Sequence, residues 1–182
     1  MGKPDKREFR AMITLFYSTR GTCDRLHTAT TLWSPEPENL FLGAGYNGAP
    51  PGIPSCDEIG HLMVEGHCIR TIHGEENALL NCHNFEKLVG GTVTGLGTPC
   101  YRCAPKLVAK KVKRVEFYGE YRNYKNSEDN EHIKELFKNA NIELECFPPE
   151  ELLRILAKGI GVLQSKGGAL KDFPNESFIF TR

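Results

Sequence analysis

Apolar residues along the chain alternate between the helical period and short runs rich in β-branched residues. Residues 5–20 follow the helical period and predict an opening helix. Its apolar face would consist of Phe9, Met12, Ile13 and Phe16. Two strands are expected next, over His27–Trp33 and Leu40–Tyr46. Pro35 and Pro37 predict a turn between them, so the strands would form a hairpin.

The chain then continues as alternating helices and strands up to residue 158. Residues 47–54 form a loop rich in Pro and Gly, and residues 55–72 are expected to be irregular. Further strands are predicted at 92–96, 112–118 and 142–147, with helices at 72–83, 99–110, 132–139 and 150–158. This alternation predicts an α/β fold with a layered sheet. Glycines from residue 159 on predict an irregular tail, which divides the chain into a domain, 1–158, and a C-terminal tail, 159–182.

Two short motifs carry the chemistry, His73-Gly74-Glu75 and Pro99-Cys100-Tyr101-Arg102-Cys103. One imidazole and two thiolates give a zinc ion three protein ligands and leave one position open, as in catalytic zinc sites. H-x-E followed by P-C-x-x-C is typical of zinc-dependent nucleobase deaminases. The motifs therefore predict His73, Cys100 and Cys103 as zinc ligands and Glu75 as the residue that carries protons.

Deamination explains why these residue types occur together. A bound zinc ion lowers the pKa of its water from about 15.7 to about 7, and a carboxylate can then move the proton to the ring and the leaving amine. The two motifs are expected at helix N-termini, whose partial positive charge favours thiolates. A C-x-x-C alone would favour a structural zinc site or a redox pair. The added H-x-E and the proline before the first cysteine favour a catalytic site.

A second group of metal-ligating residues is predicted around residues 55–72. Cys23, Cys56, His61 and Cys68 would supply the three thiolates and one imidazole of a structural zinc site. His67 competes with His61 for the fourth position, and free thiols in a small core are the alternative for the cysteines. The remaining cysteines, Cys82 and Cys146, are expected in the core. The remaining histidines, His27, His83 and His132, are expected at the surface or at the edge of a pocket.

Composition narrows the choice of substrate. The 182 residues contain 23 basic and 23 acidic side chains, so the formal net charge is zero. A nucleic-acid-binding surface usually shows a basic excess, and its absence favours a small molecule over a polynucleotide. Neither an apolar run long enough for a membrane helix nor a signal peptide is recognised. Together with the use of cysteines as metal ligands, this predicts a cytoplasmic protein.

Five segments make the assignment more specific: 20–25, 45–50, 56–61, 66–78 and 99–103. Through them the chain resembles the deoxycytidylate (dCMP) deaminase family of the cytidine deaminase superfamily, from about residue 10 to about residue 157. The resemblance implies a three-layer α/β/α fold with a mixed five-stranded sheet. It also implies hydrolysis of dCMP to dUMP and ammonia, which supplies dUMP for thymidylate synthesis. A homo-oligomer, typically a hexamer, is implied as well, with dCTP and dTTP as effectors together with Mg²⁺.

The resemblance also suggests residues that contact the substrate. Asn47 matches the asparagine that binds the nucleotide sugar, and His61 is favoured over His67 as a metal ligand. Arg25 is the candidate for the phosphate, with a solvated surface charge as the alternative. Thr28-Ala29-Thr30 stands beside the base where relatives have Val-Gly-Ala, which points to altered tolerance of groups on cytosine C5.

Other positions are less constrained by the family pattern. Gly74 replaces an alanine of most relatives, which is expected to add room near the metal. Tyr118 and Tyr121 would stack on the base or merely pack. Residues 178–180 in the tail would add an edge strand or cover a neighbouring subunit, with an unstructured end as the alternative. The competing functions are a nucleoside cytidine deaminase, a tRNA adenosine deaminase, a deaminase of C5-modified dCMP or another cytosine nucleotide, and an inactive zinc-binding relative with a regulatory role.

Overall fold

The central feature is a mixed five-stranded sheet with the strand order β2-β1-β5-β6-β7. The computed structural model describes residues 2–119 and 128–172. The strands of the sheet are β1 (Ala29–Trp33), β2 (Phe41–Tyr46), β5 (Thr92–Leu96), β6 (Arg114–Tyr118) and β7 (Glu143–Phe147). β1 runs antiparallel to β2 and to β5, whereas β5, β6 and β7 are parallel. The predicted hairpin and mixed sheet are confirmed.

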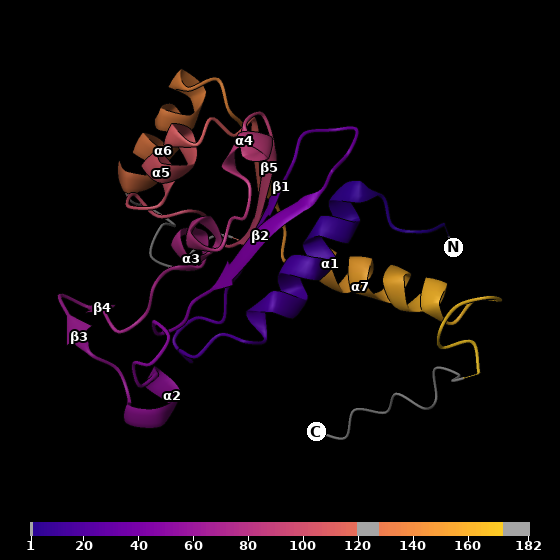
Figure 1. Ribbon diagram of the computed structural model, residues 1–182, viewed down its shortest axis with the longest axis horizontal. Helices are drawn as coiled ribbons and strands as arrows, with labels where there is room; N and C mark the ends of the chain where they lie inside the picture. Colours follow the sequence, from indigo (N-terminus) through magenta and orange to yellow (C-terminus); the bar gives the residue numbers. More distant parts are fainter. Residues whose placement is uncertain (1, 120–127, 173–182) are drawn as a thin grey trace.

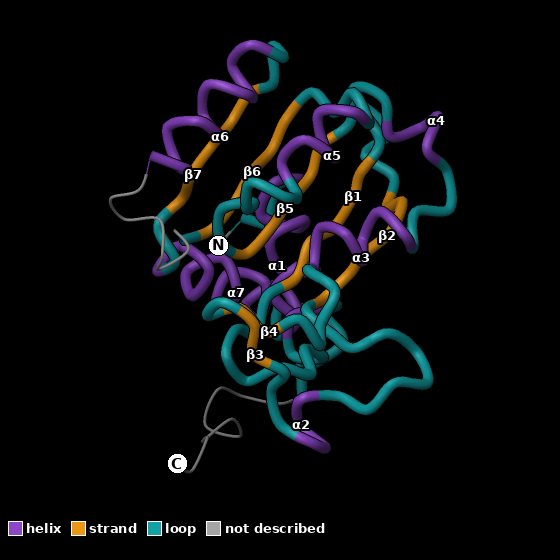
Figure 2. Tube along the Cα trace, turned by 90° about the vertical axis from the view of Figure 1, so that its left-hand side faces the viewer, coloured by secondary structure: helices purple, strands orange, loops and turns teal. Residues whose placement is uncertain are grey.

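Helices cover both faces of this sheet, which confirms the three layers (Figures 1 and 2). One face carries α3 (Gly74–Leu80), α5 (Ala104–Ala109) and α6 (Glu128–Asn139). The other face carries α1 (Lys6–Ser18) and α7 (Glu150–Leu163). Parallel strands need crossover connections, and α5 and α6 provide them between β5, β6 and β7. The short helix α4 (Phe85–Leu88) precedes β5.

The main hydrophobic core lies between the sheet and α3, α5 and α6. It includes Leu32 and Leu42 of the hairpin, Leu107 of α5 and Phe137 of α6, all almost fully buried. A smaller cluster on the other face joins α1 and α7 to the sheet through Ala11, Tyr118 and Ile155. Among the described residues, no helix combines the length and the apolar character needed to cross a membrane.

Helix α3 approaches β2 so closely that only glycine fits between them. A Cβ atom at Gly45 would lie 2.2 Å from the backbone nitrogen of Ala78, and one at Gly43 would lie 3.0 Å from the carbonyl oxygen of Asn81. The side-chain amides of Asn77 and Asn81 donate to the carbonyl oxygens of Tyr46 and Ala44, both at 3.0 Å. These contacts fix the position of α3 on the sheet.

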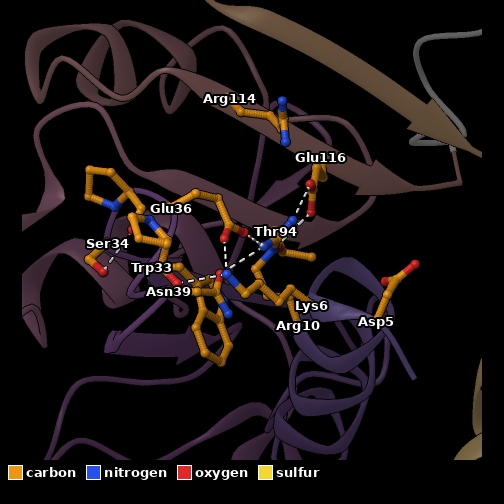
Figure 3. Close-up of polar contacts among 12 residues, drawn as sticks. Asp5, Lys6, Arg10, Trp33, Ser34, Glu36, Asn39, Thr94, Arg114 and Glu116 are labelled. Atoms are coloured by element: carbon orange, nitrogen blue, oxygen red, sulfur yellow. Dashed lines mark hydrogen bonds and ion pairs between the residues drawn. The ribbon is translucent and has the colours of Figure 1, made fainter. Parts of the chain in front are cut away.

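A buried ion pair joins α1 to the parallel strands on the opposite face (Figure 3). Arg10 donates to both carboxylate oxygens of Glu116, at 2.5 and 3.1 Å, and both side chains are almost fully buried. Glu116 also accepts from the Thr94 hydroxyl at 3.2 Å, and Arg10 donates to Asn39 Oδ1 at 2.7 Å. With these partners the buried charges are satisfied, as such groups require.

The prediction for the apolar face of α1 is only partly confirmed: Met12 and Ile13 are partly buried, and Met12 packs against the smaller cluster. Phe9 and Phe16 are exposed, whereas Arg10, Ala11 and Thr14 are buried against the sheet. The reason is that the sheet beneath α1 presents polar groups: Glu116 binds Arg10, and the hydroxyl of Thr31 lies 2.7 Å from that of Thr14. The helical spacing predicted the helix correctly, but the polar groups of the sheet determine which side of the helix is buried.

Several boundaries also differ from the predictions. The helix expected from residue 99 begins at Ala104, because residues 100–103 form a turn in which the amides of Cys103 and Ala104 donate to the carbonyl of Cys100. The last helix continues to Leu163 instead of ending at residue 158, and Gly159 packs there against Met12. α6 starts four residues earlier than expected.

The segment 55–72, expected to be irregular, contains α2 (Cys56–Ile59) and a hairpin of β3 (Met63–Val64) and β4 (His67–Cys68). Cys82 packs against the core as predicted, whereas Cys146 is exposed. His27, His83 and His132 lie at the surface, as expected. Tyr121 and residues 178–180 lie outside the described residues.

We expect Gly45→Ala to lower the free energy of unfolding by about 3 kcal/mol, because the added methyl group overlaps the backbone of α3. Chemical denaturation followed by circular dichroism measures the change. Gly95→Ala on β5 is the matched control, since a Cβ there meets its nearest neighbour at an ordinary 3.5 Å. Equal stability of the two variants would contradict the close approach of α3.

Candidate active site and metal centres

The strand register brings the functional motifs to one end of the sheet. Ala29 of β1 pairs with Tyr46 of β2, and Thr30 pairs with Gly95 of β5. Because β1 runs antiparallel to both neighbours, its start lies beside the ends of β2 and β5. The segments that precede β1 and follow β2 and β5 therefore meet there, as is usual for ligand sites at the carboxyl ends of strands.

His73 and Glu75 are positioned by the start of α3. His73 is the N-cap residue with an extended backbone, and Glu75 lies in the first turn, as predicted. The amide of Gly74 donates to Asn47 Oδ1 at 2.9 Å, which ties the helix start to the loop after β2. A Cβ at Gly74 would lie 3.3 Å from both Ala29 Cα and the Gly45 carbonyl oxygen. This glycine therefore lets α3 approach the strands and does not widen the metal site.

The first group of possible metal ligands consists of His73, Cys100 and Cys103. His73 Nδ1 lies 3.4 Å from Cys100 Sγ and 3.6 Å from Cys103 Sγ. Tetrahedral zinc, with bonds of about 2.3 Å to sulfur and about 2.0 Å to nitrogen, would hold such atoms about 3.5 Å apart. The spacing and the chemistry of the three donors fit zinc and leave a fourth position for a non-protein ligand.

The two thiols of this group differ in acidity. A hydrogen bond from Cys103, followed by the contact with His73, lowers the pKa of Cys100 to about 4. The hydrogen bond to Cys100 and burial raise the pKa of Cys103. One thiolate therefore forms readily, and a divalent cation is the partner that would allow both thiols to ionise.

Glu75 lies beside these ligands and lines a cleft that His73 and Cys100 also line. Burial, followed by the negative charge of Cys100, raises the pKa of its carboxyl group. Desolvation destabilises a carboxylate relative to its protonated form. A carboxyl group in this environment can take up and release a proton during a reaction.

The second group consists of Cys23, Cys56, His61 and Cys68, whose ligand atoms all lie within 4.8 Å of one another. Cys56 Sγ lies 3.5 Å from Cys68 Sγ, and Cys23 Sγ lies 3.7 Å from His61 Nδ1. The other ring nitrogen of His61 lies 3.0 Å from Asp24 Oδ1, which is a common orienting contact for a metal-bound histidine. Three thiols and one imidazole fit a closed tetrahedral zinc site.

The histidine in this group is His61. His67 is exposed, lies on β4 and lines the cleft instead. Burial and the neighbouring thiols raise the pKa of Cys56 to about 12. Burial also acts on Cys68, but the backbone hydrogen bond from Arg70 and the contact with Cys56 outweigh it and lower its pKa to about 7. As in the first group, one thiol ionises more easily than its neighbour.

A cleft of about 230 Å³ connects the two groups. His73 and Cys100 line it from one group, and Cys23 and Cys68 from the other. The hairpin β3–β4 therefore contributes both to the second metal group and to the wall of the cleft.

The predicted substrate contacts are only partly brought together. Arg25, Thr28 and Asn47 line the cleft, with the Thr28 hydroxyl donating to the carbonyl of Leu96. Ala29 and Thr30 are fully buried in β1 and are not among the lining residues, so their contact with a base stays a prediction.

Tyr118 packs away from the cleft. It is buried on the side of α1 and stacks on Phe147, with ring centroids 5.1 Å apart. Its hydroxyl accepts from Arg7 at 3.2 Å. Of the two roles predicted for Tyr118, the structure therefore confirms packing.

The cleft residues that the sequence reasoning missed include Glu76, Thr98, Tyr101 and Arg102. Each lies beside or within the H-x-E or P-C-x-x-C motif, and that proximity is the signal that could have identified them. Thr98 is buried next to Pro99, and its hydroxyl has no hydrogen-bond partner among the described residues.

The three-layer fold, the three-ligand group and the adjacent carboxyl group define the class of nucleobase deaminases. A solved structure with the same fold is the dCMP deaminase of cyanophage S-TIM5 in complex with dCMP and dUMP. It has a TM-score of 0.62 and 20% identity, and the alignment covers 81% of this chain and 100% of that one.

Sequence comparison identifies the family within this class. The deoxycytidylate deaminase of Mycobacterium phage D29 is 30% identical over 132 residues, which cover 66% of this chain and 99% of the phage protein. The ComE operon protein 2 of Bacillus subtilis (strain 168) is 30% identical over 135 residues, covering 74% of this chain and 67% of that protein. No family model matches the chain. The chain belongs to the deoxycytidylate deaminase family and is a deaminase.

We expect the purified protein to contain about two zinc ions per chain by elemental analysis, one for each ligand group. Cys103→Ser and Cys56→Ser should each retain about one, because each removes a ligand from a different group. Cys146→Ser is the control, since this exposed cysteine belongs to neither group. A wild-type content of one zinc that disappears in Cys103→Ser would exclude the second site.

Proposed function

We propose that the chain catalyses the zinc-dependent hydrolytic deamination of dCMP to dUMP and ammonia. The observation that carries this proposal is the convergence of His73, Cys100, Cys103 and Glu75 at one cleft. Relatives named deoxycytidylate deaminase support the substrate, as does the similar fold of a cyanophage enzyme solved with dCMP and dUMP. The dUMP formed would supply thymidylate synthesis.

The ligand set supports zinc over harder divalent cations, because thiolate and imidazole are ligands that zinc prefers to magnesium or calcium. His73, Cys100 and Cys103 would hold the ion. When bound, zinc supplies the Lewis acidity that allows a water molecule to ionise near neutral pH. The second group, Cys23, Cys56, His61 and Cys68, would hold a structural zinc without an open position.

Glu75 would move the protons of the reaction. Its carboxylate accepts a proton from water, and the resulting hydroxide adds to C4 of cytosine while Glu75 gives the proton to N3. Glu75 then transfers the proton of the new hydroxyl group to the amine, the C4–N4 bond breaks, and ammonia leaves as C4 becomes a carbonyl. The raised pKa of Glu75 supports this role, because the group must hold a proton between the two steps.

The rest of the cleft would orient the nucleotide. Asn47, which accepts from the Gly74 amide and donates to the Leu26 carbonyl, is held rigidly and would contact the sugar. Arg25 would contact the phosphate. Thr28, with Ala29 and Thr30 behind it, would border the base.

A second candidate substrate is dCMP substituted at C5. The observation that favours it is Thr28 at the cleft wall, followed by Ala29 and Thr30, at the positions where the family has Val-Gly-Ala. A threonine in place of a valine changes the shape and polarity of the wall beside the base, and with them the C5 groups that fit there.

We expect rapid loss of the cytosine absorbance from dCMP, and much slower loss from CMP and deoxycytidine. Glu75→Gln should lower turnover about 1,000-fold, because it keeps the size of the side chain but cannot accept a proton. Zinc content measured on the same samples is the control and should not change. Faster turnover of 5-methyl-dCMP would select the second candidate. No turnover of any nucleotide by the zinc-loaded protein would identify an inactive relative.

Family membership also leads us to propose a cytoplasmic homo-oligomer, a hexamer, regulated by dCTP and dTTP with Mg²⁺. Sedimentation equilibrium should then give the mass of six chains. The rate should depend sigmoidally on dCMP, becoming hyperbolic with dCTP and Mg²⁺ and decreasing with dTTP. A hyperbolic curve that neither nucleotide changes would exclude this regulation.

A further inference from the structure

The described arginines fall into two sets. Those that form ion pairs with carboxylates are Arg7, Arg10, Arg114 and Arg154. Within residues 2–119 and 128–172, those without an ion pair are Arg20, Arg25, Arg70 and Arg102. Two of these, Arg25 and Arg102, line the cleft.

The carboxyl groups of the cleft do not compensate these two charges. Glu76 forms an ion pair with Lys106 of α5. Glu75 lies beside the ligands of the first group and forms no ion pair with an arginine among the described residues. Arg25 and Arg102 therefore line the cleft with no carboxylate within ion-pair distance among the described residues, which is the arrangement expected for an anionic ligand.

Arg102 is held in place by its position in the turn between two ligands of the first group. The turn is closed by the Cys103 amide, which donates to the Cys100 carbonyl at 2.9 Å. Arg102 Nε donates to the Tyr101 hydroxyl at 3.1 Å, and the guanidinium lies 5.6 Å from the centroid of the Tyr101 ring. In the described part of the chain, its Nη1 and Nη2 atoms have no hydrogen-bond acceptor, so both remain available to a ligand.

Arg25 comes from a different segment of the cleft wall. It follows Cys23 of the second group by two residues, and its Nη2 donates to the Gly66 carbonyl in the turn of the β3–β4 hairpin at 3.2 Å. Its Nη1 lies 3.4 Å from Met63 Sδ, a weak acceptor. Arg102 therefore lies between two ligands of the first group, and Arg25 lies two residues after a ligand of the second group.

We infer that Arg102 determines specificity for the phosphate of the substrate and binds that phosphate together with Arg25. The planar guanidinium matches two phosphate oxygens at once, and two such groups suit a dianion better than one. This inference rests on the proposed function, because it takes the anion to be the phosphate of a cytosine nucleotide. It makes the turn between the zinc ligands a substrate-binding element as well as a metal-binding one.

The test compares kcat/KM for dCMP and for deoxycytidine, which lacks the phosphate, in the zinc-loaded protein. Arg102→Ala should lower the value for dCMP about 10- to 100-fold, the effect of losing a charged hydrogen bond. The value for deoxycytidine should stay within about twofold, because its contacts do not change. Arg102→Lys should show a smaller loss for dCMP, since it keeps the charge but lacks the planar fork.

Arg20→Ala is the control and should leave both values unchanged. Arg20 is an exposed arginine without an ion pair among the described residues, and it does not line the cleft. Zinc content is measured for every variant, because Arg102 lies between two ligands. An equal loss for both substrates would overturn the inference and assign Arg102 a role in shaping the metal site. No loss for either would make it a surface charge.

A binding experiment distinguishes a failure of this inference from a failure of the proposed reaction. In the Glu75→Gln background, calorimetry should show that Arg102→Ala weakens dCMP binding about 10-fold and leaves deoxycytidine binding unchanged. If the wild-type protein does not deaminate dCMP but binds it in this Arg102-dependent manner, the reaction is wrong and the phosphate site stands. If dCMP binds no better than deoxycytidine in the parent protein, the phosphate site is excluded.

Discussion

The approach of α3 to β2 is the constraint on which the site depends. With no side chain at Gly43 and Gly45, the backbone of the helix rests directly on the strand, and the amides of Asn77 and Asn81 bind its carbonyl groups. Where two backbones are in direct contact, no flexible side chain lies between them that could absorb a small displacement of the helix. The start of α3, and with it His73 and Glu75, is therefore held firmly at the end of the sheet.

The mixed sheet explains why residues distant in sequence meet at this place. An antiparallel hairpin followed by three parallel strands puts the start of β1 and the ends of β2 and β5 side by side. The face with α3 and α5 carries the ligands, whereas the other is joined to α1 through Arg10, Glu116 and Thr94.

The two ligand groups give the cleft its shape and its charge. Both contain thiols whose ionisation is uneven, and in both a metal ion is the group that would balance the negative charge. One group contains the turn that carries Tyr101 and Arg102, and the other supports the hairpin that Arg25 contacts. The same short segments would therefore bind the metal ions, form the walls of the cleft and recognise an anion.

The sequence by itself determined the layered α/β fold, the first ligand group, the three cysteines of the second group and the position of Glu75. These follow from local patterns: hydrophobic period, turn residues and metal-ligating residues at short spacing. Only the tertiary structure decided that α1 buries Arg10 and Thr14 instead of Phe9 and Phe16, that His61 and not His67 joins the three thiols, and that Arg102 faces the cleft. Each of these features depends on the side chains of another segment that packs against the first. The hydrophobic spacing within one segment carries no information about the segment that will pack against it.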